Sequence, residues 1–333
     1  MSRVSITGIT VRAMFAMGTM GTIALCAAAS AFAADYPVKA IRIVAPFPPG
    51  GSVDLVARIL GADLSKALGQ QIIIDNRGGA TGMIGTELAK NAAPDGYTLL
   101  INTLPFVTNQ FAYSKTSYNP VSDFAPVSLL ASVASVLVSH PALPVNSMKE
   151  LVVLARAQPG AITYGTAGAG SNPHIAGELL NNLAKIKLLP IHYKGGGPAT
   201  VATLSGETQL YFVNAIPEAL PHINAKRLKA LGITDTRRNS SAPQIPTMAE
   251  AGLPGYEFVT WQILAAPKGT PQPVIALLSE KVRAVLKTPD AIKRWQDRGL
   301  DVIASTPEEM AAHLAREIKK WGAVFKEQGI RSE

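Results

Sequence analysis

The fold is decided by residues 41–52, which read Ile41-Arg42-Ile43-Val44-Ala45-Pro46-Phe47-Pro48-Pro49-Gly50-Gly51-Ser52. The first five residues form a short β-rich run that stops at Pro46. From Val53 onward, apolar residues recur at helical spacing until Gly69, which predicts a helix over residues 53–68. A strand that passes through a glycine-containing turn into a helix is the opening of an α/β unit.

The same alternation continues along the chain. Strands at 72–74 and 98–101, with a helix at 83–91 between them, indicate a parallel sheet wound by right-handed crossovers. The middle of the chain repeats the pattern, with helices predicted at 148–157, 175–183 and 199–204 and strands at 162–164, 188–193, 209–213 and 228–233. A strand at 258–264 and helices at 274–286 and 307–328 follow. Two α/β units in one chain predict a ligand cleft beyond the carboxyl ends of the strands.

Four glycine-rich turns lead from predicted strands into predicted helices, two in each half of the chain. They cover residues 46–52, 76–82, 165–174 and 193–198. Glycine lets main-chain N–H groups point outward, and a helix start carries partial positive charge, so such turns bind anions without a basic side chain. We expect Ser52 to cap the first helix, and Asp54 to interact with the helix dipole or with a polar ligand group. Together the turns predict a cleft suited to carboxylates.

The motifs of cofactor, metal and hydrolase sites do not occur in the sequence. Gly168-x-Gly170-x-x-Pro173 lacks the third glycine of a dinucleotide turn, and there is no Gly-Lys-Ser/Thr or G-x-S-x-G motif. The histidines show no metal-site spacing (His140, His174, His192, His222 and His313). We therefore expect no cofactor, no metal and no catalysis. A secreted acid-transforming enzyme that uses Ser171, His174 or Lys194 is the weaker alternative.

Several aromatic residues and His174 have two interpretations each. His174 opens a helix beside a glycine loop, where it contacts the ligand or caps the helix. Phe47, Phe106 and Trp261 line an aromatic pocket or fill the core. Trp321 and Phe325, one helical turn apart, are predicted to lie in the core.

The N-terminus decides the compartment. Arg3 and Arg12 precede an apolar stretch that ends in Ala31-Phe32-Ala33, and these are the parts of a secretory signal peptide. Cleavage after Ala33 removes Cys26, which is the one cysteine among 333 residues. A membrane anchor and a lipoprotein modified at Cys26 are the alternatives. The net charge of the full chain is +8, and because its basic residues are scattered, they do not indicate nucleic-acid binding.

A set of six short stretches is specific to one protein family. They are residues 44–54 (VAPFPPGGSVD), 75–80 (DNRGGA), 94–100 (PDGYTLL), 192–195 (HYKG), 246–252 (PTMAEAG) and 266–271 (APKGTP). In this order, and over the chain from about Tyr36 to the C-terminus, they resemble the Bug receptors, the extracytoplasmic solute-binding proteins of tripartite tricarboxylate transporters.

The resemblance implies an α/β fold of the type II periplasmic-binding-protein class, with two Venus-flytrap domains and a ligand cleft between them. Residues 1–33 would be the signal peptide, 34–137 plus 259–333 domain 1, and 138–258 domain 2, with hinges near 136–139 and 255–260. A carboxylate would be held largely by main-chain N–H groups and bridging waters. The candidate ligand-binding residues are Phe47, Pro48, Gly50, Gly51, Ser52, Asp54, Ala80, Thr81, Gly82, Thr103, Gly170, Ser171, Asn172, His174, Tyr193, Lys194, Gly195 and Asn214.

Three departures from the family pattern bear on the ligand. Gly79 and Thr81 stand where the family often has a proline and a glycine, and Thr81 narrows the loop and adds a hydroxyl. Pro173 begins the helix that follows Ser171. Asn214 is a neutral amide where many relatives carry Asp, which argues against recognition of an amine and favours a plain or aromatic acid.

The expected partners follow from the same resemblance. We expect a monomeric periplasmic protein that captures a small organic carboxylate, either a di- or tricarboxylate or an aromatic acid, for a membrane transporter. A receptor that presents its ligand to a membrane sensor is the alternative. Nucleic acid is not an expected partner.

Overall fold

The computed structural model describes residues 36–239 and 241–328, and the predicted signal peptide with Cys26 lies outside them. Six strands form the first sheet in the order β11-β4-β10-β3-β1-β2. Their bounds are β1 Ile41–Ala45, β2 Ile72–Asn76, β3 Thr98–Asn102, β4 Phe124–Ala134, β10 Val259–Pro267 and β11 Leu300–Val302. The predicted parallel pairing is confirmed for β1 with β2 and with β3. The strands β10, β4 and β11 pair in antiparallel fashion.

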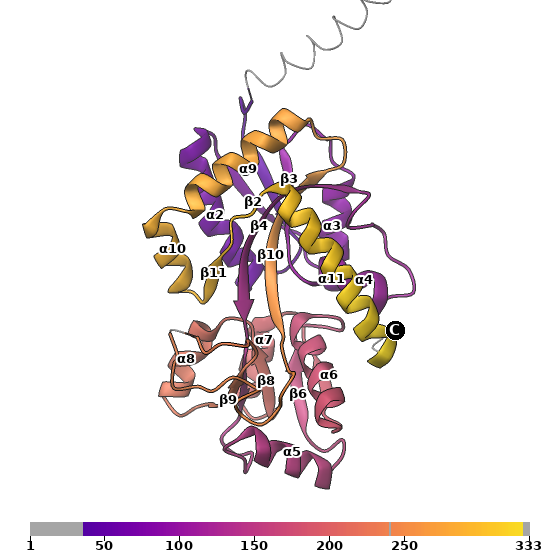
Figure 1. The fold of residues 1–333 in the computed structure, drawn as a ribbon, viewed down its shortest axis with the longest axis vertical. Coiled ribbons are helices and arrows are strands. Elements are labelled where there is room, and N and C mark those ends of the chain that lie inside the picture. The colour runs from indigo at the N-terminus through magenta and orange to yellow at the C-terminus, as the bar shows by residue number, and fades with distance from the viewer. Residues whose placement is uncertain (1–35, 240, 329–333) are drawn as a thin grey trace, which may run out of the picture.

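Helices cover both faces of this sheet, and together they form the first unit (Figure 1). They are α2 (Ser52–Leu68), α3 (Met83–Lys90), α4 (Pro105–Ala112), α9 (Gln272–Leu286), α10 (Pro289–Gln296) and α11 (Pro307–Gln328). One core holds Leu60 of α2 and Leu278 of α9, and the other holds Phe106 of α4 and Trp321 of α11. Both cores draw on β1, so this strand is buried on both faces, as its continuous apolar sequence requires.

The second unit is built on a five-stranded sheet of order β7-β6-β8-β5-β9. Its strands are β5 Val136–Ser139, β6 Thr163–Thr166, β7 Leu189–His192, β8 Leu210–Val213 and β9 Lys229–Ile233. Its helices are α5 (Met148–Ala157), α6 (Asn172–Ala184), α7 (Gly196–Leu204) and α8 (Ile216–Asn224). The chain therefore folds into the mixed α/β, two-unit architecture of the periplasmic binding proteins.

The chain passes between the two sheets at two adjacent points. Ser135 alone separates β4 from β5, and β10 begins the return at Val259 (Figure 1). Thr234 joins both crossings: its Oγ1 accepts a hydrogen bond from Ser135 N at 2.8 Å, and its carbonyl accepts one from Phe258 N at 2.9 Å. The predicted boundary between residues 137 and 138 falls within β5, and the division into domains remains a prediction.

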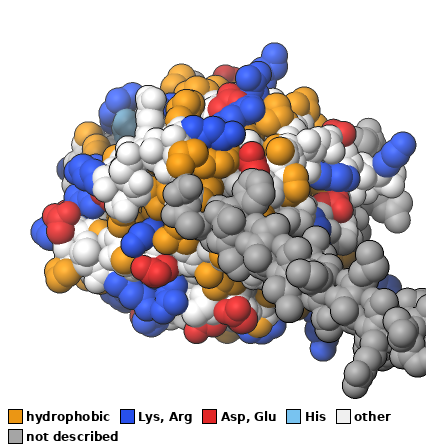
Figure 2. All heavy atoms as spheres, turned by 90° about the horizontal axis from the view of Figure 1, so that it is seen from above, with side chains coloured by type: hydrophobic (Ala, Val, Ile, Leu, Met, Phe, Trp, Pro, Cys, Tyr) orange, Lys and Arg blue, Asp and Glu red, His pale blue; other side chains and the backbone are white. Residues whose placement is uncertain are grey.

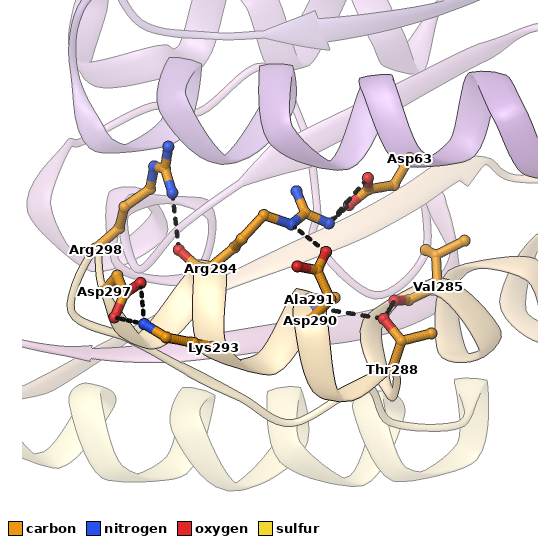
Figure 3. A network of polar contacts seen from close by, with 9 residues as sticks. All are labelled: Asp63, Val285, Thr288, Asp290, Ala291, Lys293, Arg294, Asp297 and Arg298. Carbon is orange, nitrogen blue, oxygen red and sulfur yellow. Dashed lines mark hydrogen bonds and ion pairs between the residues drawn. The ribbon is translucent and has the colours of Figure 1, made fainter.

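Polar contacts fix α10 against the rest of the first unit (Figure 3). Arg294 donates two hydrogen bonds to the carboxylate of Asp63 on α2, at 3.0 and 3.1 Å, and a third to Asp290. The side chain of Thr288 caps α10 by accepting a hydrogen bond from Ala291 N at 3.2 Å. A single guanidinium nitrogen, Nη2, contacts both oxygens of Asp63 while Nε donates to Asp290, so Arg294 links α10 to α2.

The predicted core aromatic residues are buried. Trp321 and Phe325 lie in the core, as the helical spacing predicts. Phe106 stacks on Tyr118 with ring centroids 5.6 Å apart, and Trp261 donates a hydrogen bond from Nε1 to Glu317, so both fill the core rather than a ligand pocket. Phe47 is half-buried, and its ring packs against Gly82.

The surface carries mixed charges. On the face that Figure 2 shows, Lys and Arg side chains are interspersed with acidic and apolar ones. Within residues 36–239 and 241–328, no helix combines the length and the apolar character that a membrane crossing requires.

Candidate functional site

The predicted glycine-rich loops of the two units meet. In the first unit, loops follow the carboxyl ends of the parallel strands β1, β2 and β3; in the second, loops follow the parallel strands β6, β7 and β8. Thr81 Oγ1 in the first unit donates a hydrogen bond of 2.6 Å to the carbonyl of Ala169 in the second. The ring of Pro48 lies beside Gly195, where a Cβ would be 3.8 Å from Pro48 Cγ. The strand ends that open sheets use for ligands therefore face one another, and loops of the two units are in contact there.

Asp54 holds the loop between β1 and α2. Its Oδ2 accepts hydrogen bonds from Gly50 N and Arg58 Nε, both at 3.0 Å, and its Oδ1 accepts one from Asn76 Nδ2 at 3.0 Å. Asn76 also donates to the carbonyl of Phe47 at 3.1 Å. Both carboxylate oxygens are occupied, so Asp54 organises the loop from within its own unit. The Arg58 and Asn76 hydrogen bonds, with that from Gly50 N, hold the pKa of Asp54 below its usual value although burial opposes this shift.

The prediction that Ser52 caps α2 is wrong. The N-cap residue is Gly51, with an extended backbone, and no side chain accepts a hydrogen bond from the first turn. Helix α7 likewise begins after Gly195 with no side-chain cap. The first N–H groups of these two helices are left without a side-chain partner, which makes the helix starts suitable for an anion.

The loop between β2 and α3 contains a strained turn. Ala80 and Thr81 have φ angles of 47° and 51°, which place two consecutive non-glycine residues in the left-handed region. This conformation is a genuine outlier for a β-branched residue such as Thr81. The carbonyl of Thr81 is fixed by Asn109 Nδ2 of α4 at 3.1 Å, so α4 supports the turn.

Thr103 follows β3 and presents a buried hydroxyl to this region. Its main-chain N–H donates to Asn102 Oδ1 at 2.8 Å, and Asn102 in turn donates to Thr86 Oγ1 at 2.9 Å. The Oγ1 of Thr103 is buried and has no hydrogen-bond partner among the described residues.

The loop between β6 and α6 places further unpaired polar atoms at a helix start. Ser171 is the N-cap residue of α6, but its side chain accepts no capping hydrogen bond. Ser171 Oγ and Asn172 Oδ1 are both buried and have no partner within the described residues. Helix α6 begins at Asn172, before the predicted residue 175, because Pro173 in its first turn needs no hydrogen-bond acceptor.

His174 has a local role in the same loop. Its Nδ1 accepts a hydrogen bond from Gly170 N at 2.9 Å, and its ring meets the ring of His192 edge to face, with centroids 5.0 Å apart. The Nδ1 acceptor fixes the neutral tautomer with the proton on Nε2. Burial, with a smaller contribution from His192, lowers the pKa of His174 to about 4.

The remaining predicted residues of the second unit differ in what they offer. Tyr193 donates its hydroxyl proton to Glu207 at 2.7 Å, and Lys194 is exposed. Asn214 directly follows β8, and its Oδ1 is buried without a partner among the described residues. Asn214 thus completes a group of four predicted residues with buried, unpaired side-chain oxygens, namely Thr103, Ser171, Asn172 and Asn214.

Charged side chains contribute little to the meeting point of the loops. Arg58 is paired with Asp54, and Arg77 is paired with Asp75. Over residues 36–239 and 241–328, no group of three or more His, Cys, Asp or Glu residues has the placement to hold a metal ion. The chemistry that these loops offer is therefore hydrogen bonding by main-chain N–H groups and neutral side chains, together with the exposed ammonium group of Lys194.

Two residues that touch the predicted site were not predicted. Tyr113 OH lies 2.8 Å from Thr81 Oγ1, and Asn109 holds the carbonyl of Thr81. Both belong to α4 or directly follow it, and no periodic pattern indicates this short helix. Asn76, which holds the loop after β1 through Asp54 and the carbonyl of Phe47, belongs to the stretch 75–80 that resembles the family, and this resemblance is what could have indicated its role.

A separate cavity lies within the first unit, and Phe106 is among its lining residues. It measures about 130 Å³, and nine of its ten lining residues are apolar, with Lys268 as the exception. None of the unpaired buried oxygens lines it. A ligand site needs a few convergent polar groups, so the strand-end loops are the better candidate.

Comparison with protein families gives a match over most of the chain. Residues 56–330 match the family described as "Tripartite tricarboxylate transporter family receptor". A UPF0065 protein in the tcbD-tcbE intergenic region of Pseudomonas sp. strain P51 is 36% identical over 298 residues, which cover 89% of this chain and 88% of the relative. Protein BugT of Bordetella pertussis is 35% identical over 308 residues, covering 91% and 94%.

Solved structures show the same architecture. Rpa4515 of R. palustris with adipate superposes with a TM-score of 0.85 at 33% identity, over 89% of this chain and 99% of the other. MatC from Rhodopseudomonas palustris with bound malate gives a TM-score of 0.81 at 33% identity, over 87% and 99%. Both of these similar proteins were solved with a dicarboxylate.

Proposed function

This chain belongs to the tripartite tricarboxylate transporter receptor family, and from that premise we propose that it binds a small organic carboxylate between its two units. The binding residues are those of the strand-end loops, with Thr103, Ser171, Asn172 and Asn214 as the side chains that touch the ligand or its bridging waters. Asp54 acts as a positioning residue for the first loop. The proposal assigns binding and no catalysis.

The four buried, unpaired oxygens carry this proposal. Leaving a buried polar group without a partner costs about 1–3 kcal/mol, so native proteins rarely do so without a reason. Here four such atoms belong to residues that follow the ends of three strands, β3, β6 and β8, in two units. A polar ligand that lies between the units would satisfy them together.

A carboxylate fits these loops better than other polar ligands. The helix starts after Gly51 and Gly195 have no side-chain cap, so their N–H groups are available to an anion. Relatives with similar folds were solved with adipate and with malate. A carboxylate that gives up its hydrating water can be held by main-chain N–H groups and bridging waters, so a basic side chain is not required.

The site of action follows from the N-terminal sequence and the family. We propose that residues 1–33 are removed on export, that the mature protein acts as a monomer in the periplasm, and that it delivers its ligand to a membrane transporter.

The test is thermal unfolding of residues 34–333 with a panel of aliphatic, hydroxy, amino and aromatic carboxylates. At about 100 times its Kd, a ligand stabilises the folded state by roughly 2.7 kcal/mol, which raises the midpoint by roughly 5 °C. The diamide of each active acid is the matched control, because it keeps the carbon skeleton and loses the charge. A rise with an acid and not with its diamide supports the proposal, whereas no rise with any acid overturns it.

A further inference from the structure

Two hydroxyl groups of the first unit meet a single main-chain carbonyl of the second. Thr81 Oγ1 donates to the carbonyl of Ala169 at 2.6 Å, and Tyr113 OH donates to the same carbonyl at 3.2 Å. The two hydroxyls also lie 2.8 Å from each other. The two hydroxyls carry two protons, so two of these three contacts are hydrogen bonds at any one time. We refer to Thr81, Tyr113 and Ala169 as the clasp.

The strained turn brings Thr81 to this position. Left-handed backbone at a β-branched residue is unfavourable, and it persists only where the surrounding structure fixes it. Asn109 of α4 donates a hydrogen bond to the carbonyl of Thr81. The turn ends at Gly82, whose carbonyl accepts a hydrogen bond from the side chain of Thr86. The left-handed conformation aims the Thr81 side chain out of its own unit and toward Ala169.

The clasp acts on the loop that carries unpaired ligand-facing oxygens. Ala169 is two residues before Ser171 and three before Asn172, both at the start of α6. The intervening Gly170 is held by His174 through its N–H. Because Ala169 is tied to the first unit and Gly170 is tied to His174 of α6, the first turn of α6 is linked to the first unit through this loop.

We propose that Thr81 and Tyr113 are positioning residues for ligand binding, which hold the second unit closed and slow the release of the ligand. This inference rests on the proposed function for its ligand, but the clasp itself needs no ligand. Because its hydrogen bonds lie entirely within the protein, the closed form is populated before a ligand arrives, and opening must break them. Because the clasp must open before a ligand can enter or leave the site, it slows both association and dissociation.

The test uses isosteric variants. Thr81→Val keeps the branched shape and loses the hydroxyl, Thr81→Ser keeps the hydroxyl, and Tyr113→Phe loses the other partner. Tyr97→Phe is the matched control, since Tyr97 OH accepts a hydrogen bond from Val38 N within the first unit. The probe is adipate or malate, whichever raises the wild-type unfolding midpoint more, and stopped-flow fluorescence measures its association and dissociation rates.

We expect Thr81→Val to raise the dissociation rate about tenfold and to raise the association rate as well, and Thr81→Ser to retain the wild-type rates. Tyr97→Phe should behave as wild type. The increase in the logarithm of the dissociation rate should be smaller in the double variant Thr81→Val/Tyr113→Phe than the sum of the increases in the two single variants, because both hydroxyls contact the same carbonyl. Equal dissociation rates in all variants would overturn the clasp.

Two further readouts separate the clasp from a structural role and from the proposed function. Thr81→Gly relieves the left-handed strain, so it should unfold at no lower denaturant concentration than wild type and yet release the probe faster. Small-angle scattering without ligand should give a larger radius of gyration for Thr81→Val than for wild type. If neither probe binds wild type, the proposed function fails for these acids, while the scattering result still decides whether the clasp exists.

Discussion

Ser171 and Ser139 each have a buried hydroxyl without a partner among the described residues, and they lie at opposite ends of the parallel strands of the second sheet. Ser171 lies beyond the carboxyl end of β6, whereas Ser139 pairs with Leu210 at the start of β8. The pair therefore separates the effect of an unpaired hydroxyl on folding from its effect on a ligand.

We predict that Ser171→Ala lowers ligand affinity about tenfold, which corresponds to roughly 1.4 kcal/mol for one hydrogen bond. The unliganded protein should be as stable as wild type or more so, because the variant removes an unsatisfied group. Ser139→Ala is the control: its stability should change in the same direction, and its affinity should equal that of wild type. Titration calorimetry and urea unfolding measure both, and equal affinities for the two variants would contradict the assignment of Ser171.

His174 makes stability depend on pH. Its folded-state pKa is about 4, below its usual value, so between about pH 6.5 and pH 4 the unfolded chain binds a proton that the folded chain does not. Stability from this residue is present above pH 6.5 and is lost as the pH falls, by up to about 3 kcal/mol. Burial also lowers the pKa of His192, although Glu178 opposes the shift, so His192 acts in the same direction.

We predict that the free energy of unfolding falls less between pH 7 and pH 4.5 in His174→Gln than in wild type. Glutamine keeps an acceptor for Gly170 N and does not titrate. Urea unfolding at the two pH values gives the comparison. An equal loss in both proteins would assign the acid sensitivity to other groups.

At the scale of single elements, Thr234 ties the two crossings of the chain. Its hydroxyl accepts from Ser135 N and donates to Ser135 O at 3.1 Å, and all three groups are buried. We predict that Thr234→Val destabilises the protein by about 1–3 kcal/mol, because Ser135 N is left buried and unpaired. Thr234→Ser should lose less. The shift of the urea midpoint, at an unchanged m-value, measures the loss of unfolding free energy in each variant. If Thr234→Val were as stable as wild type, water would replace the hydroxyl as the partner of Ser135 N.

The sequence predicts those elements whose local pattern agrees with their packing. The helices Met148–Ala157 and Pro307–Gln328 and the strand Ile41–Ala45 have the predicted bounds. The two helices are amphipathic and have clear caps, and the strand is almost continuously apolar. In each case the local sequence preference agrees with the way the element packs in the fold.

Other elements were missed because their residues are ambiguous without neighbours. Strand β4 mixes Ala, Ser and Pro126 with larger apolar residues, so it alternates poorly, and its burial depends on β10 and β11 on either side. Helix α8 contains Pro217 and Pro221, which predict a break rather than a helix. Pro217 in the first turn needs no acceptor, and the short helix tolerates Pro221.

The candidate site also has a part that the sequence predicts and a part that it does not. Glycine-rich turns mark the loops because main-chain geometry needs glycine locally, at Gly50 and Gly195 for example. The partners that hold these loops, Asn109 and Tyr113, come from a helix without a sequence signal. Their contacts with Thr81 exist only once α3 and α4 have packed together.

At the scale of the whole molecule, the two units share a core. A single apolar cluster includes Tyr164 and Ile175 of the second unit and Trp261 of the first. Phe258 meets Trp321 edge to face at 5.8 Å, and Tyr256 OH donates to the carbonyl of Ala176 at 2.9 Å. This continuity should couple the unfolding of the units.

We predict a single unfolding transition. All three tryptophans, Trp261, Trp295 and Trp321, lie in the first unit, so their fluorescence reports mainly on that unit and on the core that it shares with the second. Far-ultraviolet circular dichroism reports on both units. The two signals should give the same midpoint in urea. A fluorescence transition that precedes the loss of circular dichroism would show that the units unfold separately.

The paired crossings at Ser135 and Phe258 also determine how the molecule would bear a mechanical load. The second unit is a loop of chain tied off at its neck by Thr234, and both β1 and α11 belong to the first unit. Tension between those two elements is carried by the first sheet before it reaches the loop of chain that forms the second unit. Only after β10 has been stripped from β4 would the pull reach the slack loop, so an optical trap would extend the molecule in that fixed order.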